Sequence, residues 1–183
     1  LVANLEATEA QIERFDRKLL SELKPEAGLL DLLETLPGVD RIGAAMLLVE
    51  IGTDMGVFGS AERLASWAAL CPGNHESAGK RASGRTRQGN RYLRRLLVEV
   101  AHAASRTRSA LRHKFDSLLP RRGYKRAIIA IGHKILRIIY RLLERREPYR
   151  DSATDYEALH VQRNAPRWLR ALIKHGYITP ATA

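Results

Sequence analysis

The chain has 183 residues, of which 45 % are hydrophobic, enough for one domain with a real core plus appendages rather than two full domains. Its formal net charge of +11 is unevenly divided: residues 1–60 hold 11 acidic and 5 basic side chains, and residues 61–183 hold 9 and 26. Such a basic surface favours a polyanion, and nucleic acid is the leading candidate because neutralised phosphates release their condensed counterions.

The same features argue against several other classes. Cys71 is the only cysteine, which excludes an intrachain disulfide and a cysteine-based zinc site; we expect it to be a small buried residue. There is no apolar run of 18 residues and no signal-peptide pattern, so we expect a cytoplasmic, nucleoid-associated protein with no membrane partner. The chain opens at Leu1 inside a helical pattern, which we interpret as a piece of a longer protein.

The N-terminal quarter reads as a series of helices. Apolar residues at helical spacing over 2–23 predict an amphipathic helix that ends near Lys24-Pro25, and we interpret residues 1–24 as the end of a coiled-coil or linker helix. Shorter helices are predicted at 29–36 and 41–51. A further helix is predicted from Ala61, with Ser60 as its N-cap.

The middle of the chain changes character. Residues 71–89 are rich in Gly, Ser and Arg and lack a hydrophobic period, so they predict an irregular basic loop, which at this length is usually functional or disordered. After Asn90 a buried helical stripe is predicted from six residues: Leu93, Leu96, Leu97, Val100, Ala101 and Ala104. Arg91, Arg94 and Arg95 are then expected to point away from the core.

A long central helix is predicted from about Arg121 to Arg146. Its apolar face holds Ile128, Ile131, Ile135, Ile138 and Leu142, and its basic stripe holds Lys134, Arg137, Arg141 and Arg145. A weak helix follows near 168–177. No strand-like alternation of useful length is found, so the predicted fold class is all-α, a compact helical domain at 25–150 with a C-terminal helical tail at 151–183.

A first motif lies between the two short helices, within residues 28–52. Leu36-Pro37-Gly38 through Gly43 resembles a helix-hairpin-helix, in which glycines and unpaired amides let the backbone approach a DNA phosphate. Gly38 and Gly43 are therefore candidate DNA contacts. The alternative is a plain helical corner in which Gly38 only permits a left-handed cap, and the nearby Asp40 weighs against a strong phosphate site.

A second motif is the basic loop with the helix start that follows it. The candidate nucleic-acid contacts are Lys80, Arg81, Arg85, Arg87, Asn90, Arg91, Arg94 and Arg95. Composition alone favours simple phosphate or RNA contact. A sharper hypothesis makes one serine a nucleophile on phosphorus, since nearby cations could stabilise both the alkoxide and the transition state.

Several segments together resemble the C-terminal transposase domain of the insertion-sequence one-ten family. They are Pro37-Gly38-Val39 through Ala44, Trp67 through Gly73, Ser77-Ala78-Gly79-Lys80, Gly84-Arg85, and Gln88 through Arg94, in order and at family-like spacing over about 25–146. The resemblance implies transposition by RNA-guided DNA recombination with a structured bridge RNA. It also implies a RuvC-type, RNase-H-like domain with four metal-binding acidic residues, followed by a coiled coil, upstream of this one.

The same resemblance singles out one hydroxyl. The family's motif of small residues begins with a serine that falls on Ser77, which is our candidate catalytic nucleophile. Ala78 stands where a second glycine is common, and Thr86 stands where many relatives have another serine. His75 could accept the proton, although we interpret it as a surface or phosphate-contacting residue.

The remaining expectations concern what this chain lacks or assembles with. Only Glu62 and Glu76 are acidic between 61 and 98, so we expect no metal or cofactor here and a magnesium site in the missing N-terminal domain. The chain alone is expected to be inactive, and the assembled recombinase to be a homo-oligomer. Two alternatives stay open: a helix-hairpin-helix DNA-binding module without chemistry, and a structural RNA-binding domain.

Overall fold

The computed structural model describes residues 1–71, 75–77, 80–83, 89–152 and 156–178, without the side chains of 75–77, 80–83, 156, 157 and 160. Its helices are α1 (Val2–Glu22), α2 (Ala27–Glu34), α3 (Arg41–Ile51), α4 (Ala61–Trp67), α5 (Arg91–Arg106), α6 (Ala110–Arg122), α7 (Tyr124–Arg145) and α8 (Tyr156–Lys174). Two short 3-10 turns, η1 (Lys24–Glu26) and η2 (Met55–Val57), and two strands, β1 (His75–Ser77) and β2 (Lys80–Ser83), complete the described elements. The predicted all-α fold class is confirmed.

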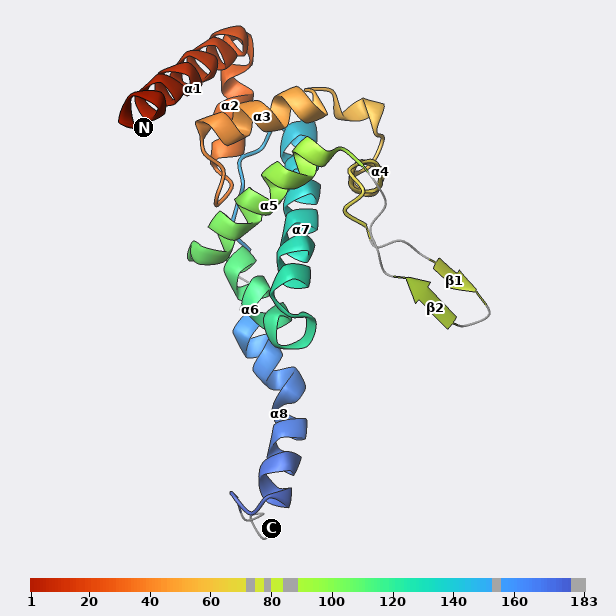
Figure 1. Cartoon of the computed structure of the whole chain (residues 1–183). Helices are drawn as coiled ribbons and strands as arrows, with labels where there is room; N and C mark the ends of the chain where they lie inside the picture. The colour runs from red at the N-terminus through yellow and green to blue at the C-terminus, as the bar shows by residue number, and fades with distance from the viewer. Residues whose placement is uncertain (72–74, 78–79, 84–88, 153–155, 179–183) are drawn as a thin grey trace.

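The centre of the fold is α7, a helix about 33 Å long at 1.5 Å per residue. It packs against α2, α4, α5 and α6, which surround it (Figure 1). Its side chains Ile131, Ile135 and Ile139 are each 0 % exposed, because apolar residues recur at helical spacing toward these neighbours. The central helix predicted from the sequence is therefore confirmed, with bounds shifted by three residues or fewer.

The stripe predicted for α5 is confirmed as well. All six of its apolar residues are buried, and they face α7, α3 and α6. Because this face of α5 packs on the core, its opposite face points to solvent. Arg91 and Arg95 at the start of α5 are exposed there. The packing of one helix face thus decides where the basic residues of the second motif lie.

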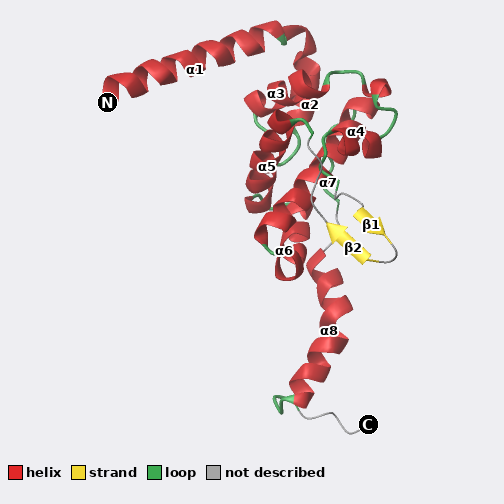
Figure 2. Cartoon of the chain, turned by 45° about the vertical axis from the view of Figure 1, so that its right-hand side comes forward, coloured by secondary structure: helices red, strands yellow, loops and turns green. Residues whose placement is uncertain are grey.

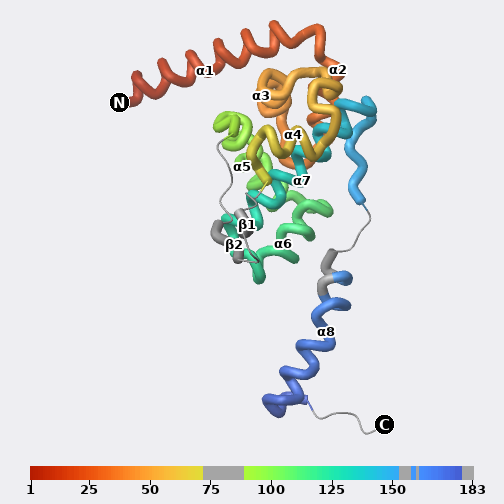
Figure 3. The backbone as a smooth tube through the Cα atoms, turned by 90° about the vertical axis from the view of Figure 1, so that its right-hand side faces the viewer, coloured from red at the N-terminus to blue at the C-terminus, as the bar shows by residue number. Residues whose placement is uncertain are grey.

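The first and last helices extend away from the helical body at its two ends (Figure 3). None of the residues of α1 is buried, and Leu5, Ile12 and Phe15 are exposed. The interpretation of α1 as the end of a coiled coil stays a prediction. Helix α8 is longer than the weak helix predicted near 168–177, and it carries Trp168 and Leu169 on its exposed surface.

Two secondary-structure features differ in kind from the sequence-based prediction: an additional helix and a short ribbon. Helix α6 was not predicted, because its apolar residues Leu111 and Phe115 are few and Pro120 lies in its last turn. The predicted irregular loop at 71–89 contains an antiparallel two-stranded ribbon, β1–β2, which extends to one side of the helical body (Figure 1) and is drawn in yellow in Figure 2. Its strands are only three and four residues long, too short to give an alternating pattern.

A segment after α7 runs back along the body. Arg146 ends α7 in the left-handed conformation, at φ 58°, and residues 147–152 then form what we call the strap. Two hydrogen bonds hold the strap: the Tyr149 N–H donates to Thr35 Oγ1 at 2.8 Å, and the Asp151 carboxylate accepts from the Ala110 N–H at 3.0 Å. A side-chain anion at the start of α6 also suits the positive end of the helix dipole.

Candidate nucleic-acid interface

The β1–β2 ribbon brings together residues from both ends of the predicted serine motif. In its register Ser77 faces Lys80, Glu76 faces Arg81 and His75 faces Ser83. The backbone therefore places Ser77 and Lys80 as partners at the tip-side end of the two strands. The side chains of Ser77, Lys80 and Arg81 lie outside the described residues, as do Arg85 and Arg87 altogether.

The chain enters the ribbon from the end of α4. Ala69 takes a left-handed φ of 52°, and the Leu70 N–H donates to the Ala65 carbonyl at 3.2 Å, so the helix ends in a tight hydrogen-bonded turn. Leu70 is buried in the core. Cys71, half-buried rather than fully buried as predicted, places its Sγ 3.7 Å from His133 Nε2 on α7. The chain at Cys71, four residues before β1, is thus held against the central helix.

The chain leaves the ribbon through a second close contact with the same turn. A Cβ placed on Gly89 would lie 2.5 Å from the Ala69 Cβ and 2.8 Å from the Ala68 carbonyl oxygen. Such distances are far inside ordinary contact, so only glycine fits while both backbones stay in place. We call residues 70–89 the ribbon segment, since they contain β1 and β2. Its last residue, Gly89, therefore packs directly on the turn from which it starts.

Asn90 fixes the start of α5 immediately after this contact. Its Oδ1 accepts from the N–H groups of Tyr92 at 2.9 Å and Leu93 at 3.0 Å, which makes it a full N-cap. Its Nδ2 donates to Glu50 Oε2 at the end of α3. Asn90 was predicted as a nucleic-acid contact; in the structure it joins two helices, and direct contact stays a prediction.

The three arginines at the start of α5 are placed differently from one another. Arg94 is half-buried and its Nη2 donates to the Ala69 carbonyl at 3.1 Å, so it holds the ribbon's base rather than pointing away as predicted. Arg91 lies 5.3 Å from the centre of the exposed Tyr92 ring. Arg95 pairs with Glu99 at 3.0 Å, with 84 % of its side chain exposed.

Arg91 and Arg95 are available to an outside anion at little cost. An exposed pair between residues i and i+4 contributes about 0.3–0.5 kcal/mol, and an exposed cation–π contact about 0.5–1 kcal/mol. A phosphate that displaces either contact replaces a weak interaction with a charge-assisted hydrogen bond. Arg91 and Arg95 therefore form an exposed cationic surface within six residues of Gly89.

The polar groups at the turn between α2 and α3 are bonded to neighbouring side chains. Asp40 caps α3 and its Oδ1 accepts from the Gly43 N–H at 2.7 Å, the amide that a phosphate would need. Arg41 pairs with Asp31 and with Glu34, and these contacts raise the pKa of the Arg41 guanidinium, with the hydrogen bond to Glu34 the largest cause. A helix-hairpin-helix phosphate site at Gly43 is thus not specifically shown.

Gly38 in the same turn has a packing role. It takes φ +88°, and a Cβ there would lie 2.7 Å from both the Ala104 nitrogen and the Val100 carbonyl oxygen of α5. The missing side chain lets the turn lie directly on the α5 backbone. Contact between Gly38 and DNA stays a prediction.

Two polar side chains of α7, His133 and Arg137, contact Cys71 and α4. Arg137 Nη2 donates to Glu62 Oε1 on α4 at 2.5 Å, and the pKa of Glu62 is lowered by its own backbone N–H and by Arg137. Burial lowers the pKa of the neighbouring His133 imidazole, and the charge of Arg137 lowers it further. His133 is therefore held toward its neutral form beside Cys71.

Within the described ranges, no group of three or more His, Cys, Asp or Glu side chains is placed to hold a metal ion. The magnesium site that the family resemblance implies belongs to an upstream domain and stays a prediction. None of the helices in the same ranges has the length and apolar character needed to cross a bilayer.

Comparison with known proteins gives one consistent family. Residues 30–116 match the family described as Transposase IS116/IS110/IS902. The chain is 30 % identical over 151 residues to a "Probable family 20 transposase" of Pseudomonas aeruginosa, a match that covers 80 % of this chain and 44 % of the relative.

Two further relatives agree with this match. The "Transposase for insertion sequence element IS1111A" of Coxiella burnetii is 33 % identical over 66 % of this chain and 34 % of its own length. The "Pilin gene-inverting protein" of Moraxella bovis is 35 % identical over 64 % of this chain and 38 % of its own length. The chain thus spans less than half of each of these three relatives. The predicted motifs at 37–44 and 67–94 lie inside the matched region, and the chain carries a transposase domain of the IS116/IS110/IS902 family.

Proposed function

We propose that this chain is the DNA-binding, serine-bearing domain of a transposase, and that the β1–β2 ribbon presents Ser77 to a DNA phosphodiester during recombination. The observation that carries the proposal is the register of the ribbon, which makes Ser77 and Lys80 backbone partners. The chain leaves the body at Leu70, whose N–H donates to the Ala65 carbonyl, and returns to it at Gly89, which packs on Ala69. A nucleophile must be held near the reacting atom, and a segment that leaves and re-enters the body at one place limits where the ribbon can lie.

The proposed step is a transesterification. The Ser77 Oγ attacks phosphorus, an Oγ–P bond forms, and the bond from phosphorus to one deoxyribose oxygen breaks. The serine proton passes to a base, and the leaving oxygen takes up a proton. The product is a covalent phosphoester that can be rejoined, because the reverse attack by a DNA hydroxyl releases the serine. Lys80, the backbone partner of Ser77, would favour the added negative charge on phosphorus.

Arg91 and Arg95 are proposed to hold the DNA backbone beside the ribbon. They are exposed at the start of α5, two and six residues after Gly89, which packs on Ala69. Their contacts would be with phosphates rather than base edges, so the binding is expected to tolerate sequence and to weaken steeply with salt.

The wider assembly is also part of the proposal and rests on the family resemblance. A bridge RNA, a magnesium-binding RuvC-type domain and a homo-oligomer would complete the recombinase. The exposed Ile12 and Phe15 of α1 support a coiled-coil contact, because isolated apolar residues at helical spacing need a partner helix to be buried.

The nucleophile is tested in the longer protein that contains this domain. Ser77→Ala is expected to abolish both recombination and the covalent protein–DNA adduct, seen as a band of retarded mobility in denaturing gels, while DNA binding is retained. Ser83→Ala, on the facing strand, is the matched control and is expected to keep both activities. Normal recombination by Ser77→Ala would refute the assignment.

DNA contact is tested with this chain alone. Reversing both charges, Arg91→Glu with Arg95→Glu, is expected to weaken duplex binding at least tenfold and to lower the salt slope by about 2. The control reverses Arg14 and Arg17 on α1, which changes the net charge equally. Equal loss in both variants would show only a general charge effect and would remove the start of α5 from the interface.

A further inference from the structure

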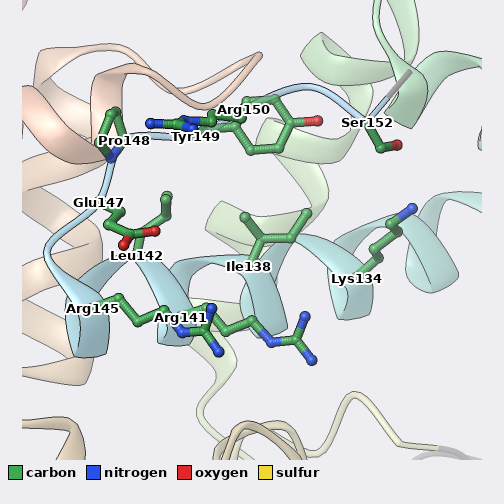
Figure 4. Close-up of a pocket in the computed structure, with 10 residues that line it drawn as sticks. All are labelled: Lys134, Ile138, Arg141, Leu142, Arg145, Glu147, Pro148, Tyr149, Arg150 and Ser152. Carbon is green, nitrogen blue, oxygen red and sulfur yellow. The ribbon is translucent and has the colours of Figure 1, made fainter. Parts of the chain in front are cut away.

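A groove lies between α7 and the strap, on a part of the molecule that the proposed catalytic step does not use. Its volume is about 390 Å³. From α7 it is lined by residues at positions 134, 138, 141, 142 and 145, which share one helix face, and from the strap by residues 147–150 and 152 (Figure 4). The groove follows α7 for about 16 Å, at 1.5 Å per residue.

The groove carries an excess of positive charge. Its lining holds Lys134, Arg141, Arg145 and Arg150, against one carboxylate, Glu147. Arg141, Arg145 and Arg150 form no ion pair with any residue in the described part of the chain. Close like charges repel, so a groove with this lining is stabilised by an anion from outside.

The groove is also rigidly built. Tyr149 is tied to Thr35, the residue that follows α2, and Asp151 is tied to Ala110 at the start of α6. Within the strap, the Tyr149 hydroxyl donates to Asp151 Oδ1 at 2.9 Å. Both α2 and α6 pack on α7. The strap then loses little conformational freedom when a ligand binds. A pre-formed site therefore gives up less binding free energy to conformational entropy.

The groove also carries apolar side chains between its charged residues, which limits the kind of anion that fits. Ile138 is half-buried and faces the groove beside Leu142, and the Tyr149 ring lies over Ile138 (Figure 4). A duplex hides the faces of its bases, whereas a single strand exposes them to apolar and aromatic side chains while its phosphates meet cations. Basic residues around apolar side chains therefore suit a single strand.

We propose that this groove binds a single-stranded segment of nucleic acid, with phosphates on Arg141, Arg145 and Arg150 and sugar or base against Ile138, Leu142 and Tyr149. The inference deepens the proposed function, since a recombinase that separates or pairs strands must hold unpaired ones. It assigns a second binding surface, apart from the ribbon and the start of α5.

The test measures binding of this 183-residue chain to fluorescent 12-nucleotide single strands of DNA and of RNA, and to a 12-base-pair duplex, by anisotropy over a series of salt concentrations. Arg141→Ala with Arg145→Ala is expected to weaken single-strand binding about tenfold and to lower the salt slope by about 1.4, because each phosphate contact on a single strand contributes about 0.7. Duplex binding is expected to change less than threefold.

Three comparisons make the result decisive. Arg14→Ala with Arg17→Ala on α1 removes the same charge and is expected to leave single-strand binding unchanged. Arg141→Lys with Arg145→Lys keeps the charge and is expected to keep most of the affinity, which separates phosphate contact from damage to the fold. Charge reversal at Arg91 and Arg95 is expected to lose the duplex and retain the single strand, so the two proposals can fail separately.

Binding of either single-stranded DNA or single-stranded RNA in the groove supports the proposal. The one that binds with the higher affinity identifies the sugar of the preferred ligand. The proposal is overturned if the Arg141/Arg145 alanine variant binds single strands with the affinity and salt slope of the unaltered chain. It is also overturned if that variant loses duplex and single strand to the same extent, since the groove would then contribute only general charge.

Discussion

Gly89 and Ala69 are in such close contact that a methyl group added at position 89 would lie 2.5 Å from the Ala69 Cβ. Twenty residues apart in sequence, they join the start and the end of the ribbon segment. The left-handed φ of 52° at Ala69 turns the end of α4 into this position. The contact sets where the ribbon leaves the helical body.

Gly89→Ala is expected to destabilise the domain by about 1–3 kcal/mol, because an overpacked contact between two backbones has no flexible side chain that could move aside. Chemical denaturation measures the loss. Gly28→Ala is the matched control: nothing lies within 4 Å of its Cβ position in α2, and a helical alanine there is expected to raise stability by about 0.5–1 kcal/mol. Equal stability of the Gly89 variant and the unaltered chain would contradict the contact.

Gly38→Ala separates packing from backbone strain. Position 38 combines φ +88° with a Cβ position 2.7 Å from the Ala104 nitrogen, whereas position 52 has φ +80° and open space. Gly52→Ala is expected to cost about 1 kcal/mol from conformation alone. Gly38→Ala is expected to lower the free energy of unfolding by at least 1 kcal/mol more than Gly52→Ala does. Urea denaturation of both variants under the same conditions measures the difference. Similar losses would show that the turn does not press on α5.

Asp40→Asn tests the helix-hairpin-helix alternative. Asparagine caps as well as aspartate, so α3 is expected to lose only about 0.3–1 kcal/mol from the weaker interaction with the helix dipole. Because Asp40 already occupies the Gly43 N–H and Arg41 is paired, we expect no gain in duplex affinity beyond that of a control.

The control for that experiment is Asp54→Asn, which removes the same charge from a similar cap, where the carboxylate accepts from the Gly56 N–H at 2.8 Å. Both variants are compared by anisotropy with one duplex at one salt concentration. A clearly larger gain for Asp40→Asn would mean that the start of α3 lies against a phosphate.

The His133 imidazole predicts how stability depends on pH. Burial lowers its pKa in the folded state below the ordinary value of about 6.5, so the unfolded chain binds more protons in this range. Stability therefore falls as pH drops through the unfolded pKa toward the folded one, and the contribution is fully present above about pH 7.5.

His133→Gln is expected to flatten the decrease in unfolding free energy between pH 7.5 and pH 5, measured by urea denaturation at each pH. His175→Gln, at the exposed end of α8, is expected to leave the decrease as it is. A His133 variant with the same pH dependence as the unaltered chain would show that the imidazole is not held toward its neutral form.

Periodicity carried most of the fold. The stripes of α5 and α7 were predictable because Leu93, Leu97, Ile131 and Ile135 repeat at the spacing of one helix face. Ile138 fits the same repeat and was predicted as buried, yet it is half-buried in the groove. Periodicity identifies a helix face, and it does not say which neighbouring segment covers that face.

The candidate site was less predictable because long-range partners define it. Arg94 follows the polar face of α5 in sequence, and its bond to the Ala69 carbonyl depends on where α4 ends. Asn90 meets Glu50, and Tyr149 meets Thr35 across 114 positions. The roles of Ser77, Lys80 and Arg81 stay predictions, since periodicity and register place only their backbones.

The contacts at Leu70 and Gly89 hold the two ends of residues 70–89 next to each other on the helical body. When the ends of a segment are fixed by the body, its interior can be lengthened at a cost that rises only by about 0.6 kcal/mol for each doubling. Changes in the length of this segment can therefore be accommodated without rebuilding the helices beneath.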